Sequence, residues 1–217
     1  MPVIDLAFDL RGGTIPLDYG YDLFGALCRV VPRLHGDRRV GVHPIRGLRL
    51  APRRLTLVPQ SRLRLRLPSE EVATYLALAG ATLDLEGSRL AVGIPRVESL
   101  RPAPDLAARL VTIGRLTEPP EFEASAHRQL AALRVSARLE FVPEDNPSRA
   151  GRPTRRVLRI KGRRIVGYSL RIAGLTAEES LLVQESGLGS RRRMGCGMFV
   201  PFVSGRLRVL DSEDRTH

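Results

Sequence analysis

The stretch Ser61-Arg62-Leu63-Arg64-Leu65-Arg66-Leu67 decides the fold class of this chain, because its apolar and basic residues alternate strictly. Side chains along a β-strand point alternately to opposite faces of a sheet, so this pattern predicts a strand with its leucines in the core and its arginines on the other face. The sequence Pro68-Ser69-Glu70-Glu71 follows and predicts a helix through about Ala79, with Ser69 as its N-cap. A strand joined directly to a helix favours a mixed α+β protein.

The residues around this stretch predict strands and one longer helix in the first half of the chain. Residues 3–10 carry β-formers in partial alternation and end before Gly12-Gly13, as a strand does. Residues 19–31 have apolar side chains at helical spacing and are followed by Pro32, which ends a helix. Further strands are predicted at 40–45 and 55–58, and a strand or hairpin, interrupted at Glu86-Gly87-Ser88, at 83–97.

The second half repeats this order of elements. Thr176-Ala177-Glu178-Glu179 has the form of a capping box and predicts a helix to about Ser186. The turn Lys161-Gly162-Arg163-Arg164 separates two apolar runs and predicts a hairpin. The remaining predicted elements are a strand at 110–113, a helix at 120–133, a strand at 135–142, the hairpin strands 157–160 and 165–170, a last strand at 198–203 and a frayed tail at 211–217.

Two successive βαββαβ-like halves predict an α+β protein of two tandem ferredoxin-like (RRM-like) domains. The proline-rich segment Pro102-Ala103-Pro104 lies between the halves. We therefore expect an N-terminal domain over residues 1–103 and a C-terminal domain, with a glycine-rich loop, over residues 104–217.

The composition points to a polyanionic partner. The chain has 217 residues with 35 basic and 23 acidic side chains, which gives a net charge of +12. Only Lys161 is a lysine, so the other basic residues are arginines. Such an excess favours nucleic acid as the partner, and solvated arginine on an ordinary basic protein is the alternative.

Several classes of protein are excluded by the same composition. No stretch of about 18 apolar residues could span a membrane, and Met1 to Asp5 have neither the basic lead nor the apolar core of a signal peptide. Cys28 and Cys196 are the only cysteines, too few for a disulfide scaffold or a zinc site. We expect a protein of the reducing cytoplasm that needs no metal or cofactor and contacts no membrane.

A basic segment lies around the predicted hairpin. Residues 151–175 hold eight basic side chains and no acidic one. Hairpins of this kind bind RNA mainly through its phosphates, although a solvated basic hairpin has the same composition. The residues expected to bind RNA here are Arg155, Arg156, Arg159, Lys161, Arg163 and Arg164.

The most specific segment is the glycine-rich sequence at 187–199. Gly187, Gly189, Gly195 and Gly197 surround the three consecutive arginines Arg191, Arg192 and Arg193. Glycine lets the backbone approach a phosphate closely, its N–H groups can cradle oxygens, and arginine supplies paired donors. The order of elements differs from a Walker loop, and a tight connection with exposed charge is the alternative interpretation.

The form G-x-G-x-x-R-x-x-G-x-G of this segment resembles the RAMP superfamily of CRISPR-associated RNA-binding proteins. Within it, the chain is similar to the endoribonucleases that cut CRISPR repeat RNA, above all those of myxobacterial-type (Myxan) type I systems. The supporting segments are Arg11-Gly12-Gly13-Thr14, Leu23-Phe24-Gly25-Ala26-Leu27, Gly41-Val42-His43-Pro44-Ile45-Arg46-Gly47 and Arg192-Arg193-Met194-Gly195-Cys196-Gly197. The resemblance implies a repeat stem-loop as substrate and a type I effector complex as a further partner.

Cleavage of RNA without a metal needs a base, an acid and a cation near the phosphate, and histidine can serve as acid or base near neutral pH. His35 follows the first predicted helix beside Arg38 and Arg39, and His43 lies on the next strand. The resemblance implies a catalytic histidine after the first helix, where His35 lies. It also implies a helix hydroxyl group, for which this chain offers Cys28. His35, His43, Cys28 and Arg39 are thus the candidate catalytic residues, and the choice between the histidines stays open.

The expected function is a metal-independent endoribonuclease that matures CRISPR repeat RNA by 2′-hydroxyl attack and leaves a 2′,3′-cyclic phosphate. A non-catalytic RNA-binding subunit of a CRISPR ribonucleoprotein is the main alternative, because the same basic surface would serve it. A basic protein–protein adaptor is the third possibility.

Overall fold

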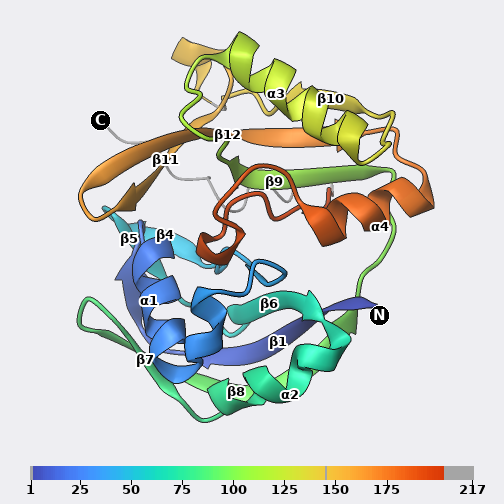
Figure 1. Ribbon diagram of the computed structural model, residues 1–217. Coiled ribbons are helices and arrows are strands. Elements are labelled where there is room, and N and C mark those ends of the chain that lie inside the picture. The colour runs from blue at the N-terminus through green and yellow to red at the C-terminus, as the bar shows by residue number, and fades with distance from the viewer. Residues whose placement is uncertain (1, 145, 203–217) are drawn as a thin grey trace. The chain divides into compact units, whose positions relative to one another are not determined.

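The computed structural model describes residues 2–144 and 146–202 of the chain (Figure 1). These residues form two compact units, of which the first ends at Ser99 and the second is Leu100–Phe202. Each unit is a mixed α+β structure built on an antiparallel sheet. The predicted tail at 211–217 and the end of the predicted last strand lie outside the described residues.

The first unit is organised around a five-stranded antiparallel sheet (Figure 1). The central strands β1 and β6 pair along most of their length, and β1 also pairs with β8. The order across the sheet is β3 (Gly41–Val42), β6 (Arg62–Pro68), β1 (Val3–Arg11), β8 (Ser88–Ser99) and β7 (Thr82–Leu85). The strands predicted at 3–10 and 61–67 and the hairpin at 83–97 are confirmed.

The alternation on β6 is confirmed for its leucines and wrong for one arginine. Leu63, Leu65 and Leu67 are fully buried, as expected. Arg66 is also buried, with 1% of its surface exposed. The carboxylate of Asp5 lies opposite it on β1 and accepts two hydrogen bonds from its guanidinium, one from Nε and one from Nη2. A buried charge needs such a partner, and the pattern of β6 alone contains no sign of it.

The helices of this unit lie on one face of the sheet (Figure 1). The predicted helix is confirmed as α1 (Gly20–Val30), whose buried side is formed by Leu23, Phe24, Ala26 and Leu27. The second predicted helix is wrong in length, because residues 69–78 form three short segments: η2 (Ser69–Glu71), α2 (Val72–Tyr75) and η3 (Leu76–Leu78). Ser69 makes no capping bond, and the Glu71 carboxylate binds Arg33 and Arg39 instead of a helix N–H.

A small three-stranded sheet completes the first unit. It has the order β2 (Thr14–Pro16), β5 (Arg54–Thr56) and β4 (Leu48–Ala51). The strand predicted at 55–58 corresponds to β5, whereas β2 and β4 were not predicted. Both are short, of four residues or fewer, and their pairing with β5 defines them.

The second unit has a four-stranded path with a fifth strand attached. The order is β10 (Arg138–Phe141), β12 (Arg163–Ala173), β9 (Asp105–Val111) and β13 (Val200–Pro201), and β11 (Arg155–Ile160) pairs with β12. The hairpin predicted at 157–170 is confirmed as β11 and β12. The predicted last strand is confirmed in its central part only, as β13.

Two helices pack in the second unit, together with the single turns η4 (Pro147–Arg149) and η5 (Arg192–Met194). On α3 (Pro119–Ala132), the buried residues Phe122, Ala126 and Leu130 recur at helical spacing and join the core with β12 residues. The capping box is confirmed at the start of α4 (Ala177–Ser186), where Thr176 and Glu179 bond each other's backbone. Over the part of the chain described, every helix is too short or too polar to cross a membrane.

Candidate functional site

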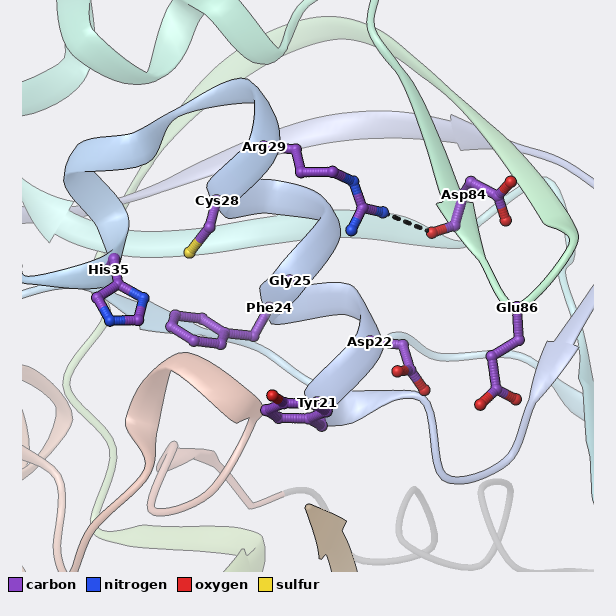
Figure 2. A pocket seen from close by; sticks show the side chains of 9 residues that line it. All are labelled: Tyr21, Asp22, Phe24, Gly25, Cys28, Arg29, His35, Asp84 and Glu86. Carbon is purple, nitrogen blue, oxygen red and sulfur yellow. Dashed lines mark hydrogen bonds between the residues drawn. The ribbon is translucent and has the colours of Figure 1, made fainter. Parts of the chain in front are cut away.

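His35 lies on the turn η1 (Pro32–His35), directly after α1. Its side chain is exposed, and its ring stacks on the ring of Phe24, with 5.9 Å between the centroids and an angle of 28° between the planes. Figure 2 shows the two rings side by side along α1. Because Phe24 is buried in the helix, it provides a fixed surface for the imidazole.

A groove of about 620 Å³ passes over α1 and includes His35 at one end (Figure 2). Cys28 lies in the groove with a half-buried thiol, so the structure brings two of the candidate catalytic residues together. Sequence reasoning did not select the other lining residues. The full lining is Tyr21, Asp22, Phe24, Gly25, Cys28, Arg29, His35, Asp84 and Glu86.

The other end of the groove is acidic. Asp22, Asp84 and Glu86 line it, and Arg29 donates to the backbone carbonyl of Asp84 at 3.1 Å. Burial, together with the charges of Glu86 and Asp18, raises the pKa of Asp22 above its ordinary value. This end would repel phosphate, so the histidine end is the part of the groove suited to an RNA backbone.

His43 is not part of this groove. It is 5% exposed, and its Nε2 lies 3.1 Å from Oδ1 of Asp5, the carboxylate that also pairs with Arg66. Burial lowers the pKa of His43 to about 4, against the hydrogen bond to Asp5, which raises it. A buried imidazole held in this way does not reach RNA, so the geometry favours His35 of the two histidines.

Arg39 is exposed, and carboxylates of the protein lie against its guanidinium. Its guanidinium donates to Asp37 and to Glu71, and the hydrogen bonds to these carboxylates raise its pKa. The pair with Asp37 could be expected from the sequence, because the two residues are only two positions apart. The pair with Glu71 could not, because Glu71 is 32 residues away along the chain.

The β11–β12 hairpin presents the predicted basic residues at its tip and edges. Arg159 and Arg164 lie directly opposite each other on the two strands, where like charges repel unless an anion lies between them. Lys161 and Gly162 form the turn, and both have positive φ. All of the predicted hairpin residues are exposed except Arg156, which is half-buried and donates to Ser169 Oγ at 2.9 Å.

The glycines of the 187–199 loop do not cradle an anion with their N–H groups, which corrects the expectation. Each N–H is donated within the protein: Gly189 to Gln129 Oε1 and Gly197 to the carbonyl of Leu110, both at 2.7 Å. Gly187 and Gly195 likewise donate to backbone carbonyls of Val183 and Arg192.

Close packing explains why these positions are glycine. A Cβ on Gly189 would lie 2.4 Å from the carbonyl oxygen of Thr112, and one on Gly197 would lie 2.1 Å from that of Leu188. Both residues have positive φ. The glycines therefore fold the loop tightly against the end of β9.

The three arginines of this loop differ in their surroundings. Arg191 has a left-handed backbone, and its Nη1 donates to Ser190 Oγ at 2.7 Å, so its side chain helps to fix the loop. Arg192 and Arg193 follow on the turn η5 and are half-exposed.

A small apolar cluster joins the hairpin to this loop. Leu158 on β11, Leu110 on β9 and Cys196 in the loop form its buried centre, and Ile160, Ile165 and Met194 pack against them. Burial raises the pKa of the Cys196 thiol to about 11, as expected for a packing residue. The two segments that the sequence singled out separately for RNA binding thus pack on one small core in the second unit.

Within the described ranges 2–144 and 146–202, no group of three or more histidine, cysteine, aspartate or glutamate side chains lies together in a way that could hold a metal ion.

Comparison with solved structures defines the class of this fold. The chain matches a structure described as "An RAMP protein binding different RNA substrates" with a TM-score of 0.65 and 12% identity, over 92% of this chain and 100% of that one. It matches a "CRISPR associated protein Cas6" with a TM-score of 0.63 and 12% identity, over 93% and 100% of the two chains. The fold is therefore that of the RAMP and Cas6 proteins.

Sequence comparison identifies the family. The family model described as "Cas6 Crispr" matches residues 4–204. The chain is also 44% identical over 201 residues to the "CRISPR-associated endonuclease Cas6" of Myxococcus xanthus (strain DK1622). The aligned residues cover 93% of this chain and 82% of that relative. The chain belongs to the Cas6 family of CRISPR-associated endonucleases.

Proposed function

We propose that this chain matures CRISPR RNA by cutting the repeat sequence in an endoribonuclease reaction that needs no metal ion. Membership of the Cas6 family supports the activity. The observation that carries the mechanism is the exposed ring of His35, stacked on Phe24 at one end of the groove over α1.

The reaction is an attack within the RNA strand. The 2′-oxygen forms a bond to the adjacent phosphorus while the bond from phosphorus to the 5′-oxygen breaks. The 2′-hydroxyl loses its proton to a base, the 5′-oxygen gains one from an acid, and the products are a 2′,3′-cyclic phosphate and a 5′-hydroxyl. His35 carries one of these two proton transfers, because an imidazole can act as base or acid near neutral pH.

The second unit supplies the RNA-binding surface. The basic hairpin, with Arg155, Arg159, Arg163 and Arg164 exposed, shares a small core with the loop that carries Arg192 and Arg193. Contact through many arginines suits the phosphates of a folded repeat stem-loop, whose grooves are read mainly by shape. The type I effector complex, as the resemblance implies, is the partner that receives the product.

The same proposal assigns one ferredoxin-like domain to each unit, with the predicted domains at residues 1–103 and 104–217, whereas the structure divides the units after Ser99. The order of main strands supports this assignment. The four main strands, numbered 1 to 4 along the chain, are β1, β3, β6 and β8 in the first unit and β9, β10, β12 and β13 in the second. Across the sheets these strands lie as β3-β6-β1-β8 and β10-β12-β9-β13, which is the order 2-3-1-4 in both units, with antiparallel neighbours throughout.

Cleavage of labelled repeat RNA in EDTA tests this function. We expect the wild-type chain to cut, His35→Ala to lose activity by about 100-fold or more, and a 2′-deoxy nucleotide at the cut to block the reaction. His127→Ala is the matched control, because His127 is an exposed histidine on α3. Binding without cleavage would instead identify an RNA-binding subunit. A requirement for magnesium, or full activity of His35→Ala, would overturn the mechanism.

A further inference from the structure

The loop that carries His35 is shaped by hydrogen bonds among its own residues. This loop, residues 32–39, lies between α1 and β3. The N–H groups of Gly36 and Asp37 both donate to the carbonyl of Arg33 at 3.2 Å. Such bonds define the form of a loop but do not attach it to the rest of the unit, so contacts with other segments must hold the imidazole in place.

A buried carboxylate from another segment binds both sides of this loop. Glu71, the last residue of η2, is 6% exposed. Its Oε1 accepts a hydrogen bond from Nη2 of Arg33 at 2.7 Å and another from Nη2 of Arg39. Arg33 lies two residues before His35 and Arg39 lies four residues after it, so one oxygen atom joins the two sides of the loop.

The surroundings of Glu71 strengthen these bonds. Hydrogen bonds between ionised partners are stronger than neutral ones, and low exposure reduces their screening by water. The other carboxylate oxygen, Oε2, accepts from the hydroxyl of Thr74 at 3.4 Å. Tyr75 is fully buried, and burial together with the charges of Asp37 and Glu71 raises its pKa to about 12. Its phenol therefore stays neutral near pH 7 and does not compete as an anion for the two arginines.

The partners of this cluster differ in exposure. The Glu71 carboxylate is buried, whereas the side chains of Arg33 and Arg39 are 59% and 50% exposed. If Glu71 is removed, water can solvate both guanidinium groups, so no charge is left buried without a partner. Loss of Glu71 should therefore release the loop rather than unfold the unit, whereas loss of the arginines would leave a carboxylate buried.

We propose that Glu71 is a positioning residue for RNA cleavage, which binds the arginines on both sides of His35 and thereby holds its ring in the stack on Phe24. The two contacts act on different parts of the same residue. The ring of Phe24 restricts the imidazole, and Glu71 fixes the backbone that carries it. The inference rests on the proposed function in one respect, since it takes His35 to be the residue that transfers a proton.

Histidine NMR of the full chain tests the positioning without RNA. A ring stacked with 5.9 Å between centroids experiences the ring current of Phe24, so the His35 ring protons should resonate away from those of the exposed His127. We expect Glu71→Ala to move the His35 signals toward those of His127, and His35→Ala assigns the signals by removing them. Glu70→Ala should leave them in place. Glu70 is the matched control because its exposed carboxylate neighbours Glu71 in the chain and lies 3.6 Å from the guanidinium of Arg39.

Single-turnover cleavage at saturating repeat RNA gives the second readout. Glu71→Ala should lower the rate by about 10- to 100-fold, because displacing a reacting group by about 1 Å can cost that much. Its affinity for uncleavable 2′-deoxy RNA should stay the same or rise, since the variant is more positive by one charge. Glu71→Gln keeps an oxygen for both arginines and should lose only about threefold in rate. Glu70→Ala should cut at the wild-type rate.

The outcomes separate this inference from the proposed function. If the wild-type chain does not cut repeat RNA, the proposed function fails and the role of Glu71 in cleavage fails with it, whereas shifted His35 signals would still show that Glu71 holds the ring. If the wild type cuts, unchanged His35 signals or an unchanged rate in Glu71→Ala would overturn the inference alone. An equal rate loss in Glu70→Ala, or a loss in Glu71→Ala that saturating RNA abolishes, would also overturn it. If Glu71→Ala does not fold, wild-type signals and rate in Glu71→Gln would overturn it instead.

Discussion

The ring of Phe24 lies against the ring of His35, with 5.9 Å between their centroids. Stacked aromatic pairs are worth about 0.5–1.5 kcal/mol, so this contact restricts the orientations of the imidazole. We predict that Phe24→Leu lowers the single-turnover rate of repeat cleavage by about three- to tenfold, because apolar volume is kept while the stacked ring is lost. The affinity for RNA should stay the same, which binding to uncleavable 2′-deoxy RNA would measure.

Phe24→Tyr is the control for this prediction, since it keeps an aromatic ring on α1 and should retain most of the rate. A Phe24→Leu protein that is folded and cuts as fast as the wild type would mean that the stacking has no part in catalysis.

The close approach of Gly189 to β9 gives a stability prediction. Gly189→Ala should reduce the free energy of unfolding by about 3 kcal/mol or more, because the new Cβ would clash with the Thr112 carbonyl at 2.4 Å and φ is +78°. Gly114→Ala should cost only about 1–2 kcal/mol, since its φ is +53° and nothing lies within 4 Å of the new Cβ. Urea unfolding monitored by circular dichroism measures both. Equal losses would show that only backbone strain matters at Gly189.

The small core between hairpin and loop predicts a loss of RNA affinity without any change in charge. Leu158→Ala opens a cavity beside Leu110 and Cys196, and buried Leu→Ala changes cost about 2–5 kcal/mol. The β11–β12 hairpin and the 187–199 loop should then no longer be held in one position relative to each other. We expect the affinity for repeat RNA, measured by anisotropy titration, to fall severalfold. The neighbour Val157 points to the opposite face of β11, so Val157→Ala should leave the affinity nearly unchanged.

Amide hydrogen exchange of the 187–199 loop accompanies this titration. Faster exchange in Leu158→Ala than in Val157→Ala would support a coupling through the core. Unchanged exchange together with unchanged affinity would argue against it.

The buried His43 predicts a pH dependence of stability. Its folded pKa, about 4, lies below the ordinary value of 6.5, so between these values the unfolded chain binds more protons at this site than the folded one. Stability contributed by neutral His43 is present above pH 6.5 and is lost as the pH falls toward 4, at no more than about 1.4 kcal/mol per pH unit. Urea unfolding at several pH values should show this slope.

His43→Gln removes the titrating group, keeps a donor for Asp5 and should flatten the slope between pH 6.5 and 4. His127→Gln changes an exposed histidine and should leave the slope as it is. A slope that persists in His43→Gln would assign the pH dependence to other groups.

The sequence by itself determined the elements whose signals are local. Leu63, Leu65 and Leu67 specified a buried strand because their period is that of a pleated sheet. The Thr176 capping box specified the start of α4, since its donors and acceptors lie within four residues. The glycine-rich segment marked the family, although the reason expected for its glycines was wrong.

The tertiary structure decided which charged and polar groups are available. Arg66 and His43 have nothing in their neighbouring sequence that marks them as buried, and Asp5, 61 and 38 residues away from them, is what makes their burial tolerable. The glycine N–H groups were expected to bind an anion, but Gln129 on α3 and the carbonyl of Leu110 on β9 use two of them. Pairing of groups far apart in the chain depends on packing, which no local pattern encodes, and it left His35 exposed while it enclosed His43.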